Sequence, residues 1–109
     1  MELVGAVYRE TSTLPKHEIF GLTAQVRRAA VSVPSNIAEG AARNSSRELY
    51  HFLGIAAGSL AELRTQLDIA ERLGYLRGPS ESLKRADNVA RLLVSLRKRI
   101  KSRLQKVDA

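Results

Sequence analysis

The stretch that decides the fold is Arg27–Gly40, which reads RRAAVSVPSNIAEG. It begins like an amphipathic helix and then meets Pro34, which removes one backbone hydrogen bond and crowds the preceding turn. The apolar residues on either side of the proline nevertheless stay on one helical face: Ala30, Val33 and Ile37. We therefore predict one long helix over residues 15–42 that is kinked at Pro34. The alternative is a break at this point, with Ser32 capping a new helix.

Five polar or conformationally special residues around the proline form a motif with an expected structural role: Pro34, Asn36, Glu39, Gly40 and Arg43. A helical wheel places Asn36 and Gly40 at the edge of the apolar stripe. Asn36 is then a partly buried amide that needs hydrogen-bond partners, and Gly40 allows a neighbouring backbone to come close. Glu39 lies one turn before Arg43, which is the favourable order for an exposed ion pair.

Three further helices are predicted from the periodicity, over residues 1–13, 45–73 and 80–106. Ser45 and Glu48 have the S-x-x-E spacing of a capping box, and apolar residues from Leu49 to Ala70 then hold a regular heptad spacing. Four amphipathic helices joined by short loops predict an all-α protein. We expect an antiparallel up-and-down four-helix bundle that forms one domain over residues 1–109.

The net charge of +7 is concentrated in the last part of the sequence. Residues 1–79 contain nine basic and eight acidic residues, whereas residues 80–109 contain nine basic and three acidic ones. Such a surplus attracts nucleic acid, acidic protein surfaces or anionic lipids, and does not choose among them. A solvated helix face that only aids solubility is the structural alternative. The candidate phosphate-binding residues are Arg91, Arg97, Lys98, Arg99, Lys101, Arg103 and Lys106.

The sequence contains no pattern typical of an enzyme or a metal site. Glu48 and His51 have the Glu-x-x-His spacing of di-iron helix bundles. The motif occurs once, however, and Leu49 and Leu53 define the inward direction, so His51 is expected to face outward. The serines have no plausible His–Asp partners, and no glycine-rich phosphate loop is present. We therefore expect a protein without catalytic residues, bound metal or cofactor.

Composition also bears on the compartment. The chain has no cysteine, which excludes disulfides and suits a reducing cytoplasm. No segment is apolar for long enough to span a membrane, and the first residues lack the layout of a signal peptide. We expect a cytoplasmic protein that does not enter a membrane.

The chain resembles a family of bacterial four-helix-bundle proteins first met as reading frames inside intervening sequences of 23S ribosomal RNA genes. Two segments carry the resemblance: LPKHEIFGLTAQVRRAAVSVPSNIAEGAAR (residues 14–43) and ELYHFLGIAAGSLAELRTQLDIAERLGYL (residues 48–76). The resemblance implies a bundle that assembles into a ring-like homopentamer, and it implies no settled activity. One related branch comprises accessory proteins of diversity-generating retroelements, which bind a reverse transcriptase and nucleic acid. Family members usually carry more residues before VYRETSTLP (residues 7–15), which implies a short first helix or an alternative start site.

These observations favour a non-enzymatic, oligomeric, basic helical protein that binds the backbone of RNA or DNA as an accessory factor, associated with ribosomal RNA or a reverse transcriptase. Aromatic residues are few, so binding is expected to depend on phosphates, with little sequence preference. The alternative is a scaffold that binds an acidic protein partner. A role at a membrane surface ranks third, because the last helix needs its apolar stripe for the bundle.

Overall fold

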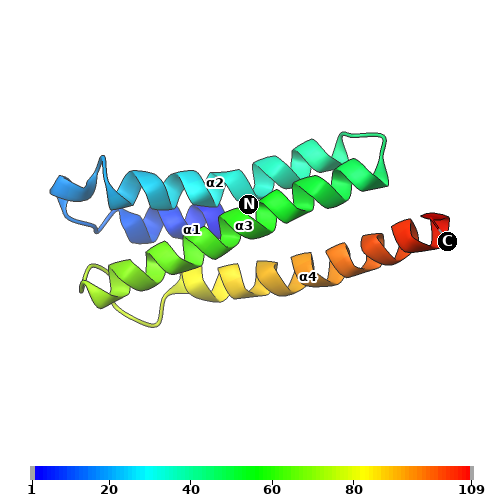
Figure 1. Ribbon diagram of the computed structural model, residues 1–109. Helices are drawn as coiled ribbons and strands as arrows, with labels where there is room; N and C mark the ends of the chain where they lie inside the picture. Colours follow the sequence, from blue (N-terminus) through cyan, green and yellow to red (C-terminus); the bar gives the residue numbers. More distant parts are fainter. Residues whose placement is uncertain (1, 109) are drawn as a thin grey trace.

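Four α-helices and one short 3₁₀ helix make up the fold (Figure 1). The structure is a computed structural model that describes residues 2–108, with side chains for residues 2–106. The elements in chain order are α1 (Glu2–Thr11), η1 (Lys16–Glu18), α2 (Leu22–Ala41), α3 (Ser46–Arg72) and α4 (Glu81–Asp108). No strand occurs in residues 2–108, and the predicted all-α four-helix bundle is confirmed.

Successive helices run antiparallel, so the topology is up-and-down (Figure 1). The α2–α3 pair has the most extensive contact, α4 packs against α3 and α1, and α2 lies diagonally opposite α4. The helix α1 has 10 residues and α4 has 28, so α1 accompanies only the first part of α4. Beyond Leu92, which lines a shallow cavity with Glu2 and Leu3 of α1, the second half of α4 (residues 92–106) is left with α3 as its one neighbouring helix.

The core is built from the predicted apolar faces. The heptad positions of α3 are its main contribution, and the largest fully buried apolar side chains are Leu3, Val7, Val26, Val33, Leu53, Leu60, Leu63 and Leu67. Burial of a leucine or valine side chain is worth about 1.5–3 kcal/mol, so this cluster dominates the stability of the bundle.

Serine side chains begin the two long helices. The Ser45 hydroxyl accepts a hydrogen bond of 3.2 Å from the backbone N–H of Glu48, as expected for the N-cap of α3. The carboxylate of Glu48 lies 3.8 Å from Arg43 rather than on the Ser45 backbone, so only half of the predicted capping box forms. The Ser80 hydroxyl caps α4 in the same way, accepting 3.2 Å from the N–H of Leu83.

The predicted start of the second helix at residue 15 is wrong. Pro15 has an extended ψ of 145° and leads into η1, and α2 begins only after Gly21, whose ψ of −110° is not helical. Glycine is a weak helix former, and here it separates η1 from α2. Ile19, between η1 and α2, is 52% exposed as a result.

The outer bounds of the first and last helices also differ from the prediction. The helix predicted over residues 1–13 ends at Thr11, because the next two residues turn away and their hydroxyls donate to carbonyls of the last turn. Its predicted first residue lies outside the described part of the chain. The helix predicted over residues 80–106 begins at Glu81 and continues to Asp108.

The stretch around Pro34 forms one continuous helix, so the alternative break with Ser32 as a cap is wrong. The bend at Pro34 stays a prediction. The half-buried Asn36 donates from Nδ2 to the Ser32 carbonyl oxygen at 2.8 Å and to its hydroxyl at 3.0 Å. The Ser32 hydroxyl in turn lies 2.7 Å from the Ser59 hydroxyl on α3. The amide therefore supports a polar contact between the two helices.

Gly40 and its neighbours close the far end of the α2–α3 contact. A Cβ atom on the buried Gly40 would lie 2.9 Å from Cβ of Phe52 and 3.1 Å from Cδ1 of Leu49, so the helices approach as closely as predicted. The predicted ion pair also forms, with Arg43 Nη2 2.5 Å from Glu39 Oε1. The Arg43 guanidinium lies 5.1 Å from the centre of the Phe52 ring, which links the ion pair to the helix contact.

Candidate nucleic-acid interface

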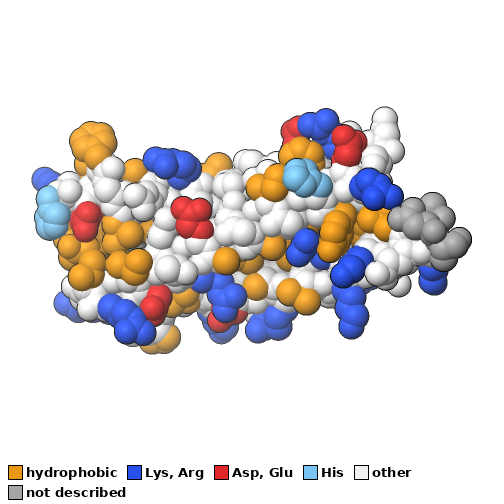
Figure 2. Space-filling model, in the orientation of Figure 1, with side chains coloured by type: hydrophobic (Ala, Val, Ile, Leu, Met, Phe, Trp, Pro, Cys, Tyr) orange, Lys and Arg blue, Asp and Glu red, His pale blue; other side chains and the backbone are white. Residues whose placement is uncertain are grey.

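The second half of α4 combines a narrow buried stripe with a basic surface. Leu93 and Ile100 are buried, and Leu104 is half-buried. No acidic residue occurs between Asp87 and Asp108. Five exposed cations follow one another along this segment, and we call them the basic cluster: Lys98, Arg99, Lys101, Arg103 and Lys106. Figure 2 shows Lys and Arg side chains projecting along the α4 edge of the molecule.

The basic cluster occupies both sides of the helix. At about 100° per residue, its members lie about 80–140° from the position of Leu93. Lys98 and Lys101 fall on one side of the buried stripe, and Arg99, Arg103 and Lys106 fall on the other. The cluster therefore surrounds the exposed part of the helix instead of forming one flat patch.

No member of the basic cluster has a carboxylate partner among residues 2–106, whereas five arginines elsewhere do: Arg9, Arg43, Arg64, Arg72 and Arg85. Arg64 pairs with Asp87 at 2.9 Å, and Arg85 pairs with both Glu2 and Glu81. The hydrogen bond from Arg85 lowers the pKa of Glu81. Because no carboxylate among residues 2–106 pairs with it, the basic cluster presents a positive potential to solvent.

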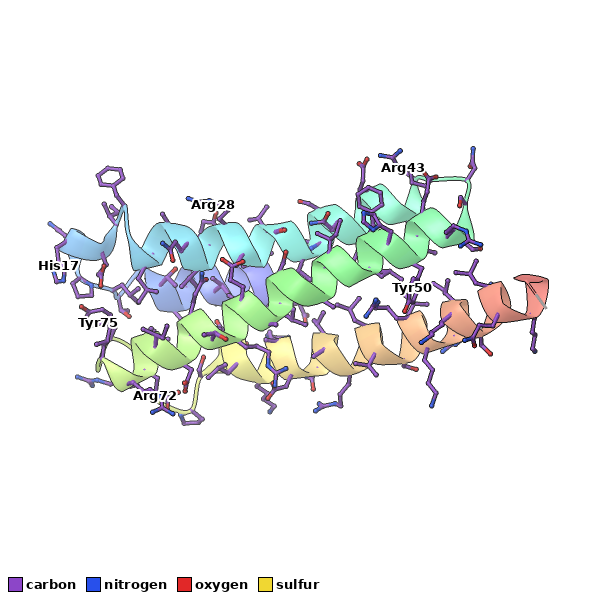
Figure 3. All side chains as sticks on the ribbon, viewed as in Figure 1. His17, Arg28, Arg43, Tyr50, Arg72 and Tyr75 are labelled. Atoms are coloured by element: carbon purple, nitrogen blue, oxygen red, sulfur yellow. The ribbon has the colours of Figure 1, made fainter. Side chains whose placement is uncertain are left out.

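Arg97, one of the predicted phosphate-binding residues, lies in the interface between α3 and α4. Its guanidinium carbon is 4.6 Å from the centre of the Tyr50 ring, and it also covers Gly54, whose added Cβ would lie 3.1 Å from Nη2. Tyr50 is labelled in Figure 3, on the side of α3 that faces α4. Its Nε is buried without a hydrogen-bond partner among the described residues. The spacing Leu93–Arg97–Ile100 places this arginine on the buried stripe, which is the signal that separates it from the exposed cations.

Arg91 lies before the basic cluster and is exposed. Its guanidinium donates to the side-chain oxygen of Asn88 one turn earlier. Arg91 and Lys98 line a shallow groove between α3 and α4, together with Arg64 and Val94. The predicted set thus divides into the exposed basic cluster, the partly engaged Arg91 and the packed Arg97.

The other side chains that could suggest chemistry lie apart from one another. His51 is exposed on α3 and packs edge-on against Phe52, with ring centres 5.4 Å apart. No group of three or more His, Cys, Asp or Glu side chains in the described part of the chain has the arrangement of a metal site. At the loop end of the bundle, His17 Nε2 lies 3.4 Å from the Tyr75 hydroxyl. Partial burial, followed by the nearby Glu18 carboxylate, raises the pKa of Tyr75.

One contact that the sequence did not suggest fixes the start of α4. The Glu10 carboxylate of α1 accepts from the Ser80 hydroxyl at 3.0 Å and from the Ser82 backbone N–H at 2.5 Å. A carboxylate at a helix N-terminus is favourable because it meets unsatisfied N–H groups and the positive end of the helix dipole. This contact sets the position of α4, and hence of the basic cluster, relative to α1.

No helix within residues 2–108 carries an apolar stretch long enough to cross a membrane. Comparison with curated protein sequences gave no match. A family model described as 23S rRNA-intervening sequence protein matches residues 1–95, which include α1, α2, α3 and the first half of α4. The match ends before Lys98, so it does not extend to the basic cluster. Because it covers most of the 109 residues, the chain belongs to the 23S rRNA-intervening sequence protein family.

Proposed function

We propose that this protein is a non-enzymatic accessory factor that binds RNA or DNA through the backbone phosphates, using the basic cluster of α4. The observation that carries the proposal is a set of exposed cations without carboxylate partners among residues 2–106. Lysine and arginine side chains extend several ångströms from a helix, so they can reach phosphates while the bundle stays folded. Each phosphate that they neutralise releases condensed counterions, which drives the association.

The chemistry of the segment favours contacts with phosphate over contacts with bases. Residues 92–106 contain no Phe, Tyr or Trp, so this part of α4 offers no aromatic ring on which a base could stack. The nearby Tyr50 ring is covered by Arg97. Binding should therefore depend little on the base sequence.

The proposal includes self-assembly in the cytoplasm into a homo-oligomer, for which the family resemblance suggests a ring of five. Several apolar side chains outside the basic segment are exposed, among them Leu73 at 56%, Ile19 at 52% and Ile69 at 42%. Exposed apolar surface on a small bundle often belongs to an interface. Repetition of the basic cluster in one particle would strengthen weak phosphate contacts. Native mass spectrometry at micromolar concentration should show a closed oligomer, and a purely monomeric spectrum would contradict this part.

A scaffold for an acidic protein partner, such as a reverse transcriptase with an acidic surface, is the second candidate. It is favoured by the exposed Leu92 and Val94, which lie within two turns of the basic cluster. Protein interfaces combine an apolar centre with a charged rim. A nucleic-acid interface needs the cations and does not need these two apolar side chains.

Fluorescence anisotropy with labelled RNA and DNA oligonucleotides at low salt tests the leading proposal. The parent protein should bind unrelated sequences with similar affinity. A variant in which four members of the basic cluster become glutamine should bind all of them at least about tenfold more weakly. The four substitutions are Lys98→Gln, Arg99→Gln, Lys101→Gln and Arg103→Gln.

The matched control removes the same number of charges elsewhere. It replaces exposed cations that also lack a carboxylate partner among residues 2–106, and these are Lys16, Arg28, Arg77 and Lys84. The control should bind nearly as tightly as the parent. No binding by the parent protein at low salt, or equal losses in both variants, would contradict the proposal and favour the protein-partner scaffold.

A further inference from the structure

The second half of α4 is open to solvent on both sides of its buried stripe. Leu92 and Val94 lie about 100° to either side of Leu93 on the helical wheel. They are 70% and 68% exposed, whereas Leu93 is 4% exposed. A helix that packs on several neighbours exposes one narrow face to solvent, whereas this segment exposes most of its circumference.

The basic cluster uses both open sides. Lys98 and Lys101 lie on one side of the helix, and Arg99, Arg103 and Lys106 lie on the other, all of them exposed. A single strand that followed one side would leave the other set of cations without phosphates. A ligand with two phosphate rows, one on each side of the helix, would neutralise both sets.

The dimensions of such a ligand match B-form DNA. An α-helix with its side chains is about 10–12 Å in diameter, and the major groove of B-DNA is about 12 Å wide. Lys98 to Lys106 spans about 12 Å along the helix axis. The edge of the helix that would face the bases carries the exposed Ser95 and Ser102. Both are small, and a serine hydroxyl bonds to several different bases, so this edge permits close approach without strong sequence selection.

The same features disfavour the other forms of nucleic acid. Proteins that prefer single strands stack bases on aromatic rings, and residues 92–106 have none. The most exposed aromatic side chain among the described residues is Phe20, at 96%, and it lies at the opposite end of the molecule from the basic cluster. Double-stranded RNA has a deep, narrow major groove that does not admit a helix.

From this arrangement we infer that the preferred nucleic acid is double-stranded DNA, with the second half of α4 lying in the major groove and the two sides of the basic cluster on the two phosphate rows. This inference rests on the proposed function, because it assigns the form of nucleic acid to the same site.

A comparison of three probes of equal length tests the inference: duplex DNA, duplex RNA and single-stranded DNA, each of about 20 nucleotides per strand, at one salt concentration. The parent protein should bind duplex DNA at least about tenfold more tightly than the other two. Equal affinity for all three, or tighter binding to the single strand, would overturn the groove placement and leave the proposed function standing. Binding to none of them would overturn both.

Two double variants test the contribution of each side of the helix. Lys98→Gln with Lys101→Gln removes one side, and Arg99→Gln with Arg103→Gln removes most of the other. Each pair should weaken duplex binding about tenfold. If only one pair matters, the helix lies on a single phosphate row and the inference is wrong.

Chemical probing locates the groove directly. Dimethyl sulfate methylates guanine N7, an atom that faces the major groove. Saturating amounts of the parent protein should protect N7 along a guanine-containing duplex. Unprotected N7 on a duplex that anisotropy shows to be bound would place the protein outside the major groove.

Discussion

Gly40→Ala should destabilise the bundle, whereas the same change at Gly58 should stabilise it. Both glycines lie inside helices, Gly40 in α2 and Gly58 in α3. Gly40 is buried, and its added Cβ would lie 2.9 Å from Cβ of Phe52. Gly58 is exposed, and its added Cβ would meet nothing within 4 Å. The pair therefore separates the effect of helix propensity from the effect of close helix packing.

The magnitudes follow from two opposing terms. Replacing glycine by alanine in a helix interior gains about 1 kcal/mol, and somewhat less near a helix end such as that of Gly40. Forcing a methyl group into a packed contact costs about 1–3 kcal/mol, and here the contacting atom is attached directly to the backbone of α3 and cannot swing aside. Gly58→Ala should thus gain about 0.5–1 kcal/mol. Gly40→Ala should lose up to about 2 kcal/mol.

Urea unfolding followed by circular dichroism measures both variants against the parent. All three proteins must be compared at one concentration, because any self-association makes the midpoint concentration-dependent. The free energies of unfolding of the two variants should differ by about 1–3 kcal/mol, most of it from the packing term. If Gly40→Ala is as stable as Gly58→Ala, the α2–α3 contact at Gly40 is not tight and this account of the motif fails.

Three further predictions concern contacts between the helices. Asn36→Leu should lower the free energy of unfolding by about 1–2 kcal/mol, because it removes the amide that donates hydrogen bonds to Ser32 in the preceding turn. Helicity measured by circular dichroism should stay nearly unchanged. A variant as stable as the parent protein would show that the amide has no structural part. Glu10→Gln should cost about 1 kcal/mol in urea unfolding by weakening the cap on α4, and the exposed Glu71→Gln serves as its control. Because the pKa of Glu81 is lowered, its contribution to stability is present above the ordinary carboxylate pKa and is lost as the pH falls through the lowered pKa. Thermal melts should therefore show a fall in melting temperature on acidification, and Glu81→Gln should reduce that fall.

The parts of the fold that the sequence predicted are those set by local spacing. The alternating four- and three-residue spacing of the leucines in α3 puts them on one face of the helix, and that face forms the core whichever helices pack against it. The cap of α3 is also local, because the Ser45 hydroxyl accepts from the N–H of a residue only three positions later. The continuity of α2 through Pro34 was also predictable, because the apolar face keeps its register across the proline.

The parts that were not predicted are one local turn and the contacts between residues distant in sequence. Whether residues 15–21 join α2 is settled by a turn at Gly21, and the periodicity alone did not reveal it. Glu10 caps a helix that begins some seventy positions later, a contact that exists only once α1 and α4 pack together. The spacing of Arg97 between Leu93 and Ile100 marks it as part of the buried stripe, but its partner, Tyr50 on α3, becomes known only from the packing. Composition located the basic segment, and the packing decides which of its cations remain exposed.

The family match and the basic cluster occupy different parts of the chain. The family match covers residues 1–95 and so accounts for the bundle and the Pro34 motif. The basic cluster begins at Lys98, and its proposed role depends on the exposure and charge of its own side chains. An experiment on the cluster therefore tests the proposed function without depending on the family.

The salt dependence of binding tests the central claim, that the basic cluster contacts phosphates, most directly. The logarithm of the association constant for duplex DNA should fall linearly with the logarithm of the salt concentration, with each phosphate contact contributing about 0.9 to the slope. Replacing Lys98, Arg99, Lys101 and Arg103 by glutamine should flatten the slope by about 3–4 per bound chain, whereas the charge-matched control should keep the slope of the parent. An unchanged slope in the cluster variant, or an equal flattening in the control, would contradict the account.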